Sequence, residues 1–236
     1  MKRNIITTSD GSKTIQIEEW NEQYHSIHGA IQEANHVFMK HGLFFYSEKI
    51  DKDQAEINQS ATKEVSILEI GFGTGLNAFL TLIEAEKLNL NINYVGVEAY
   101  PVLLDEIIQL NYIELISETH KTVFEKLHET PWEEPSSITS DFQLEKQQKF
   151  FKDINAENEF NIIYFDAFGA RVQPELWTED IFKIMFNALK ENGVLVTYSA
   201  KGSVRRAMQA VGFIVERLPG PPGKREMLRA TKHSVK

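Results

Sequence analysis

Short, almost entirely apolar runs alternate along this chain with segments of helical period. The runs typical of strands are 65–70 (VSILEI), 92–99, 160–168, 193–199, 212–218 and 226–231. The helix-like segments lie between them, at 76–88, 102–116, 178–190 and 203–210. Strands that are apolar on both faces belong to parallel sheets covered by helices on each side. The pattern therefore predicts an α/β fold built on a mostly parallel sheet.

Three parts of the chain depart from this alternation. The last two strand-like runs are separated only by PGPPGK (219–224), too few residues for a parallel crossover, which predicts an antiparallel hairpin that closes the sheet. Residues 1–60 do not alternate and are expected to form a small N-terminal cap on a main domain of residues 61–236. Segment 117–159 is polar, with one possible strand near SITSDFQL (137–144).

Composition narrows the class of protein. No apolar run approaches the ~20 residues of a membrane span, and the N-terminus MKRNIITTSDGSKT lacks the apolar stretch of a signal peptide. The chain has no cysteine, which excludes disulfides and thiolate metal sites. We therefore expect a soluble cytoplasmic protein without a membrane partner.

The charges are unevenly distributed. The 236-residue chain carries a formal net charge of −9, yet residues 201–236 contain nine Lys or Arg and only two Asp or Glu. An acidic protein is a poor non-specific binder of polyanions, but a local basic surface can still seat a phosphate backbone. The alternative is a solvated basic end with no partner.

The stretch LEIGFGTGLNAFL joins the first predicted strand of the sheet to a helix. It contains alternating glycines at Gly71, Gly73 and Gly75. A dinucleotide fingerprint would need a further glycine where Leu76 stands, and a phosphate-binding P-loop would need G-K-[ST], which is absent. The pattern that remains is E-x-G-x-G-x-G, which begins at Glu69.

Two carboxylates indicate what this loop binds. Glu69 would repel a pyrophosphate but attract an ammonium group. Glu98 ends the second strand, where a carboxylate can accept both hydroxyls of a ribose. An amino acid and a ribose without phosphate describe S-adenosylmethionine. The alternatives are a tight turn without a ligand and, for Glu98, a solvated carboxylate at a strand end.

The candidate catalytic residue is Asp166, which follows the strand-like run NIIYF. A carboxylate at this edge of the sheet can orient an amine and accept its proton while a methyl group is transferred in line. Its alternative role is to cap the following turn. Phe168 and Trp177 are candidates for stacking on a base or nucleoside, although core packing is the favoured interpretation of Trp177.

Five stretches together resemble the methyltransferase domain of the tRNA 5-methylaminomethyl-2-thiouridine biosynthesis (MnmC) family. They are YHSIHGAIQEANHVF (24–38), LEIGFGTGLNAFL (68–80), YFDAFGARVQPELWTEDIF (164–182), GVLVTYSAKGSVRRAMQAVGF (193–213) and GPPGKREML (220–228). The resemblance implies a Rossmann-like class I methyltransferase fold. It also implies S-adenosylmethionine-dependent N-methylation of 5-aminomethyl-(2-thio)uridine at the tRNA wobble position, which gives 5-methylaminomethyl-(2-thio)uridine. Since the chain ends at Lys236 without an oxidase domain, it resembles the stand-alone form, and we expect a separate enzyme to generate the amine.

The resemblance also implies a set of site residues. The implied cofactor-binding residues are Tyr24, Ser26, Gly29, Glu33, Glu69, Gly71, Gly73, Gly75, Asn77, Glu98, Asp166 and Phe168. The implied contacts to the tRNA anticodon region are Trp177, Lys201, Arg205, Arg206, Lys224 and Arg225. The competing role of these cations is pairing with acidic neighbours. No metal site is expected, because His25 and His28 are only a weak hint of one.

Two rival functions remain open. One is an aminopropyltransferase-like or other small-molecule amine transferase, which extra acidic residues around the pocket would favour and the basic C-terminal region opposes. The other is a non-enzymatic module that binds tRNA or protein on a methyltransferase scaffold, which an absence of S-adenosylmethionine binding would support.

Overall fold

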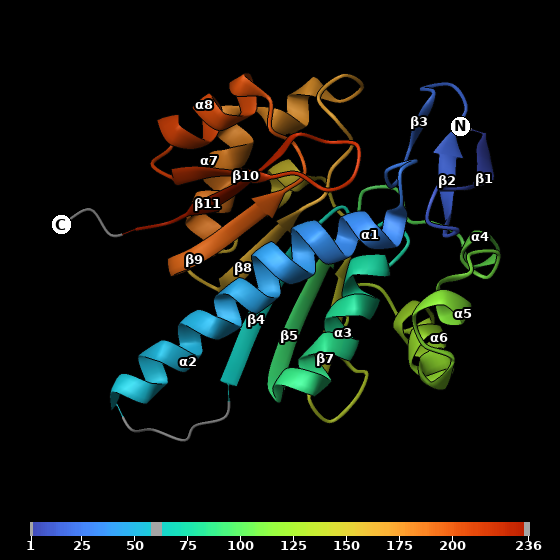
Figure 1. Cartoon of the computed structure of the whole chain (residues 1–236), viewed down its shortest axis with the longest axis horizontal. Helices are drawn as coiled ribbons and strands as arrows, with labels where there is room; N and C mark the ends of the chain where they lie inside the picture. Colours follow the sequence, from blue (N-terminus) through green and yellow to red (C-terminus); the bar gives the residue numbers. More distant parts are fainter. Residues whose placement is uncertain (1, 58–62, 234–236) are drawn as a thin grey trace.

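A mixed sheet of eight strands forms the centre of the protein. The computed structural model describes residues 2–57 and 63–233, and the strand order is β10-β11-β9-β8-β4-β5-β7-β6 (Figure 1). Parallel pairing joins β4 (Lys63–Ile70), β5 (Leu90–Val97), β7 (Phe142–Gln147), β8 (Phe160–Phe165) and β9 (Leu189–Thr197). The mostly parallel sheet predicted from the apolar runs is confirmed.

Both edges of the sheet are antiparallel. At one edge β10 (Ile214–Pro219) and β11 (Glu226–Thr231) form a hairpin, and β11 pairs antiparallel with β9. At the other edge the short β6 (Ser136–Ser137) pairs antiparallel with β7. The predicted C-terminal hairpin is thus confirmed.

Side chains of the central strands alternate between two cores. On β4, Ile67 packs into the core on one face and Leu68 into the core on the other. On β8, Ile162 and Ile163 divide in the same way. This explains why these strands are apolar at almost every position, since a residue on either face is removed from water.

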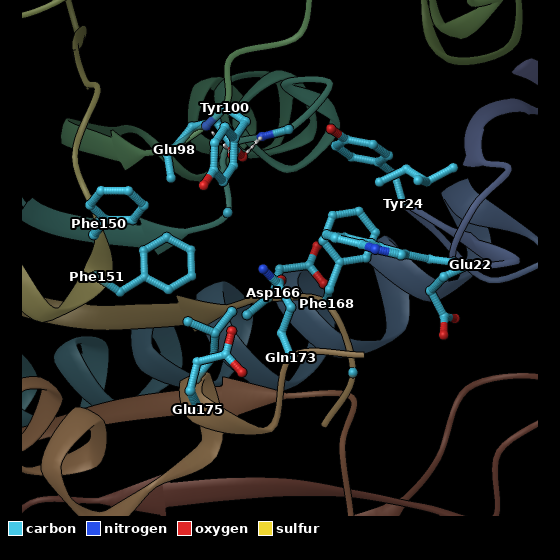
Figure 2. A pocket seen from close by; sticks show the side chains of 18 of the residues that line it. Glu22, Tyr24, Glu98, Tyr100, Phe150, Phe151, Asp166, Phe168, Gln173 and Glu175 are labelled. Atoms are coloured by element: carbon cyan, nitrogen blue, oxygen red, sulfur yellow. Dashed lines mark hydrogen bonds between the residues drawn. The ribbon is translucent and has the colours of Figure 1, made fainter. Parts of the chain in front are cut away.

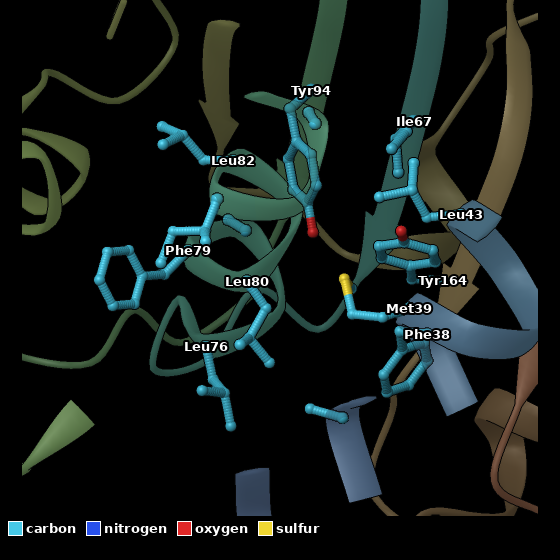
Figure 3. Packing of buried hydrophobic residues seen from close by; sticks show 14 of the residues in the cluster. Phe38, Met39, Leu43, Ile67, Leu76, Phe79, Leu80, Leu82, Tyr94 and Tyr164 are labelled. Atoms are coloured by element: carbon cyan, nitrogen blue, oxygen red, sulfur yellow. The ribbon is translucent and has the colours of Figure 1, made fainter. Parts of the chain in front are cut away.

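A continuous helical rod covers one face of the sheet. It consists of α1 (Ala30–Ala34), a π-helix η1 (Asn35–Phe44) and α2 (Phe45–Ile57), and it lies beside α3 (Leu76–Leu88) (Figure 1). Figure 3 shows residues of η1 and α3 packed around Tyr94 and Tyr164, two buried tyrosines of the sheet. The opposite face is covered by α7 (Glu179–Ala188), α8 (Gly202–Ala210), η3 (Phe151–Asp153) and η4 (Pro174–Trp177).

The N-terminal residues form a separate three-stranded antiparallel sheet. Its strands are β1 (Arg3–Thr7), β2 (Lys13–Ile17) and β3 (Glu22–Gln23). The predicted cap of residues 1–60 thus has two parts. The small sheet is separate from the main sheet, whereas the helical rod packs on the main sheet. The boundary proposed at residue 60 falls in 58–62, outside the described residues.

The prediction of one helix over 102–116 is wrong. The segment forms two short helices, α4 (Leu104–Ile107) and α5 (Tyr112–Ile116). Between them, the Asn111 side chain accepts a hydrogen bond from Lys13 N (2.7 Å) and donates one to Gly11 O (3.0 Å). These two hydrogen bonds hold the residues between α4 and α5 against the β1–β2 turn. The tertiary contact therefore interrupts the helix that the apolar period predicts.

The polar segment 117–159 contains more structure than its sequence predicts. The possible strand near 137–144 corresponds to β6 and β7, but helices η2 (Glu118–His120) and α6 (Lys121–Glu129) were not anticipated. Only two residues of α6, Phe124 and Leu127, are buried, and so small an apolar stripe is easily missed. Within the described parts of the chain, no helix has the length and apolar character needed to cross a membrane.

Candidate active site

The carboxyl ends of three parallel strands meet at one cavity of about 390 Å³. Gly71 follows β4, Glu98 follows β5 and Asp166 follows β8, and all three line it (Figure 2). This edge is where open α/β sheets bind ligands. The cavity therefore unites the main features that the sequence singles out.

The glycine loop passes directly along this cavity. Gly71 and Gly73 have φ angles of +89° and +50°, a left-handed region that favours glycine. A Cβ on Gly71 would stand 2.7 Å from the carbonyl oxygen of Asp166, and one on Gly73 would stand 3.1 Å from the Tyr24 ring. Gly75, which precedes α3, packs against His128 and does not line the cavity. The first two glycines therefore keep a cradle free of side chains.

One amide joins two carboxylates below the loop. Asn77 Nδ2 donates to Glu69 Oε1 (2.8 Å) and to Asp166 Oδ2 (2.9 Å). Tyr94 OH donates to the other oxygen of Glu69 (2.8 Å). Asn77 Oδ1 is buried and has no hydrogen-bond partner among the described residues. The network thus holds Asp166 in place and leaves one acceptor unused.

Glu69 lies beneath the loop and does not line the cavity. It is 1% exposed, and burial raises its pKa well above the ordinary value, although the bonds from Asn77 and Tyr94 oppose the rise. Its position differs from the direct contact with an ammonium group that the sequence suggests. Within the described structure, Glu69 is linked to the cavity through Asn77, which also binds the cavity-lining Asp166.

Asp166 lines the cavity but lies within the protein. Burial raises its pKa to about 7, and the nearby charge of Glu33 adds to the rise. The hydrogen bond from Asn77 and the charge of Lys224 act in the opposite direction. A carboxyl group that titrates near neutral pH is suited to accept a proton from a substrate.

Glu98 binds backbone amides at the end of β5. Its carboxylate accepts hydrogen bonds from Gly73 N (3.2 Å) and Tyr100 N (3.0 Å), while burial raises its pKa. These bonds fix the carboxylate on the cavity wall beside the glycine loop. This is the position expected for an acceptor of ribose hydroxyls.

Two of the predicted aromatic residues occupy different environments. Phe168 lines the cavity and packs edge-to-face on Tyr24, with ring centroids 4.9 Å apart. Trp177 is 5% exposed, does not line the cavity, and donates its indole N–H to Phe168 O (2.8 Å). The structure thus places Trp177 in the core behind Phe168, not at a surface that tRNA can reach.

Glu33, Ser26 and Lys224 form a cluster beside the cavity. Glu33 accepts a hydrogen bond from Ser26 N (2.9 Å) and forms an ion pair with Lys224. The Lys224 ammonium also lies 3.8 Å from the centroid of the Tyr198 ring. Gly29 begins α1 near Asp10 and, like Ser26 and Glu33, does not line the cavity. Lys224 was predicted to contact tRNA, with pairing to an acidic neighbour as the alternative, and in the structure it forms such a pair with Glu33.

The other predicted tRNA contacts lie on the surface at the same edge of the sheet. Lys201 follows β9, Arg205 and Arg206 belong to α8, and Arg225 lies in the β10–β11 loop. Lys201, Arg206 and Arg225 are exposed, whereas Arg205 is half-buried and its Nε has no partner among the described residues. The exposed cations thus lie at the edge of the sheet on which the cavity opens, and their contact with tRNA stays a prediction.

The residues present fit S-adenosylmethionine. The glycine cradle admits a close ligand, and the Glu98 carboxylate on the cavity wall can accept ribose hydroxyls. Among the described residues, no group of three or more His, Asp or Glu side chains is arranged to hold a metal ion.

Residues 112–233 match the model of a family of S-adenosyl-L-methionine-dependent methyltransferases, and the chain belongs to this family. Its cofactor is therefore S-adenosylmethionine. The chain is similar to the tRNA 5-methylaminomethyl-2-thiouridine biosynthesis bifunctional protein MnmC of Legionella pneumophila (strain Lens), with 24% identity over 234 residues. This match covers 90% of the chain and 34% of the relative, so the chain spans about a third of the length of such curated relatives.

Solved structures support the same conclusion. MnmC2 from Aquifex aeolicus matches with a TM-score of 0.76 and 26% identity, covering 99% of this chain and 71% of that one. Spermidine synthase from Thermotoga maritima matches with a TM-score of 0.53 and 15% identity, covering 100% of this chain and 75% of that one. The second likeness concerns the fold alone.

Part of the cavity wall was not predicted from the sequence. Trp20 lies in the turn after β2, Phe150 lies in the loop after β7, and Phe151 begins η3. Each stands in a polar context, EEWNEQ and KQQKFFKD. Aromatic residues set singly or in pairs among polar neighbours are the signal that could have identified them.

Replacing Gly73 by alanine should abolish most cofactor affinity. A Cβ there enters the cradle, whereas Gly11, at φ +85°, has no atom within 4 Å of a Cβ. Both Gly73→Ala and Gly11→Ala incur a left-handed strain of about 1–2 kcal/mol. Calorimetry should show at least about tenfold weaker S-adenosylmethionine binding for Gly73→Ala alone. Equal affinities in the two variants would contradict the cradle.

Lys224 and Arg225 should respond differently to replacement by alanine. Lys224→Ala leaves the buried Glu33 carboxylate without its cation, so we expect a loss of about 1–3 kcal/mol in the free energy of unfolding. Arg225→Ala removes an exposed cation and should leave the free energy of unfolding unchanged. Chemical denaturation measures both variants. A Lys224→Ala variant as stable as the wild type would refute the structural role of this pair.

Proposed function

We propose that this chain methylates the primary amine of 5-aminomethyl-(2-thio)uridine at the tRNA wobble position, giving 5-methylaminomethyl-(2-thio)uridine. The observation that carries the proposal is Asp166, a cavity-lining carboxyl group with a pKa of about 7 beside the glycine loop. The names of the MnmC relatives support the substrate. We propose that the protein acts in the cytoplasm.

The chemistry requires an amine that has lost its proton. When bound, S-adenosylmethionine supplies an electrophilic methyl group. An aliphatic ammonium group has no lone pair, so Asp166 accepts a hydrogen bond from it and takes one proton. The amine then has a free lone pair, which could accept the methyl group that bound S-adenosylmethionine would supply. Asn77 holds Asp166 Oδ2 through its amide, which fixes the direction in which the carboxylate meets the amine.

Exposed cations provide the sequence-independent part of tRNA recognition. In this proposal Lys201, Arg206 and Arg225 contact phosphates of the anticodon region. They lie at the edge of the sheet on which the cavity opens. This arrangement concentrates positive charge near the site in a chain whose net charge is −9.

One observation favours the rival transfer to a small polyamine. Four carboxylates line the cavity, those of Glu22, Glu98, Asp166 and Glu175. Two of them are engaged, however, since Glu22 pairs with Arg171 at 2.6 Å and Glu98 accepts backbone N–H groups. The remaining pair does not make a long acidic groove, so we rank this function second.

Methyl incorporation distinguishes these functions. With radiolabelled S-adenosylmethionine, we expect labelling of tRNA that carries 5-aminomethyluridine and none of the same tRNA with an unmodified wobble uridine. Full activity on a free polyamine without tRNA labelling would support the small-molecule transferase. Absence of S-adenosylmethionine binding would instead support a non-enzymatic module.

Asp166→Asn should slow methyl transfer by about 10²- to 10⁴-fold, because an amide cannot take the proton of the amine. Wild-type kcat/KM should rise as the pH passes about 7 and Asp166 ionises, and the variant should lack this step. Cofactor affinity should change only a few fold. Asp141→Asn, at the opposite end of β7, is the matched control and should behave as the wild type. An Asp166→Asn rate equal to wild type at pH 7 would refute the assignment.

A further inference from the structure

The cavity has two walls of different origin. Glu98 and Phe151 belong to the edge of the main sheet, whereas Trp20 and Glu22 belong to the N-terminal sheet. Figure 2 shows Asp166 between the labelled residues of these two walls. The glycine cradle and Glu98, which fit the cofactor, lie on the first wall. The second wall is therefore available to the methyl acceptor.

We propose that the wall formed by the N-terminal sheet is the subsite for the target base, with Trp20 as its stacking surface. This inference rests on the proposed function, since the base is that of the modified uridine. Trp20 lies in the turn between β2 and β3, is half-buried, and lines the cavity. Its ring centroid is 5.5 Å from that of Phe168, at an interplanar angle of 82°. The two rings form an aromatic corner near Asp166.

The indole N–H of Trp20 distinguishes this residue from a tryptophan that only fills the hydrophobic core. Among the described residues its indole N–H has no hydrogen-bond partner, and the side chain is not fully enclosed. Trp177 provides the contrast, because it is buried and its N–H is bonded to Phe168 O. Buried tryptophans in cores have their N–H satisfied. Trp20 keeps both ring surface and N–H available to a ligand.

Arg171 fastens Trp20 to the catalytic loop. Its Nη2 donates to Trp20 O (3.2 Å) and Asn21 O (3.3 Å) and pairs with Glu22 at 2.6 Å. Arg171 follows β8 on the segment that carries Asp166. The turn is thus tied to the residue that receives the proton, so a base on Trp20 has a fixed position relative to Asp166.

The chemistry of this wall selects a class of ligand. An indole ring binds the face of a planar base, which must leave the RNA stack to reach the cavity. The neighbouring carboxylate of Asp166 favours a cationic substituent. The subsite therefore fits a pyrimidine nucleotide that bears a short primary amine.

Kinetics with three variants test the subsite. For Trp20→Leu we expect kcat/KM for tRNA carrying 5-aminomethyluridine to fall about 10- to 100-fold, the usual effect of one stacked base, with the Kd for S-adenosylmethionine within twofold. Trp20→Phe should recover most of the loss. Trp132→Phe changes a half-buried tryptophan outside this cavity and keeps a ring against Phe72, so this variant should match the wild type. A folded Trp20→Leu enzyme with unchanged kcat/KM, or with only cofactor binding impaired, would overturn the proposal.

A binding experiment separates the subsite from the proposed reaction. The nucleoside 5-aminomethyluridine should quench tryptophan fluorescence of the wild type and of Trp132→Phe, but not of Trp20→Phe. Quenching by this probe does not depend on methyl transfer. Absence of Trp20 quenching in an enzyme that methylates tRNA would overturn the subsite alone. Quenching without tRNA methylation would support the subsite and contradict the proposed function.

Discussion

The amide of Asn77 is the interaction on which the site depends. One side-chain nitrogen serves two carboxylates, those of Glu69 and Asp166, from different strands of the sheet. Burial raises the pKa of Glu69, and the nearby charge of Asp166 adds to the rise because it disfavours a second negative charge. Without the bridging donor, the geometry that aims Asp166 into the cavity would lose its fixed support.

This arrangement has a cost in stability. The folded pKa of Asp166, about 7, lies above its ordinary value of 3.8, so the folded state binds the proton more tightly than the unfolded chain. The contribution of Asp166 to stability therefore declines as the pH rises above about 4, where the unfolded chain loses the proton, and the decline ends above about 7, where the folded protein loses it too. A pKa near 7 suits Asp166 for proton transfer. The same raised pKa means that the charged carboxylate destabilises the folded protein.

Much of the fold could be predicted because a buried strand is apolar at almost every position, which the sequence shows directly. The apolar runs that became β4, β8 and β9 follow from side chains enclosed on both faces, and the short PGPPGK link required a hairpin. The break between α4 and α5 could not be predicted, since it depends on bonds from Asn111 to a turn about 100 residues away.

The candidate site was predictable to a similar extent. Gly71, Gly73, Glu98 and Asp166 come together because they follow parallel strands, which sequence periodicity reveals. The wall built by the N-terminal sheet, and the pairing of Lys224 with Glu33, arise from packing between distant segments. No local pattern specifies such contacts, so a cation that the sequence marks for tRNA is engaged within the protein.

We infer that Asp166, a partly buried carboxyl group, changes charge near neutral pH beside the cofactor cradle, and the proposed catalysis depends on this property. Its pKa can be measured by ¹³C NMR titration of aspartate-labelled protein, with the Asp166→Asn spectrum identifying the resonance. The account predicts a midpoint of about 7. A midpoint near 4, the ordinary value of an exposed aspartate, would contradict it.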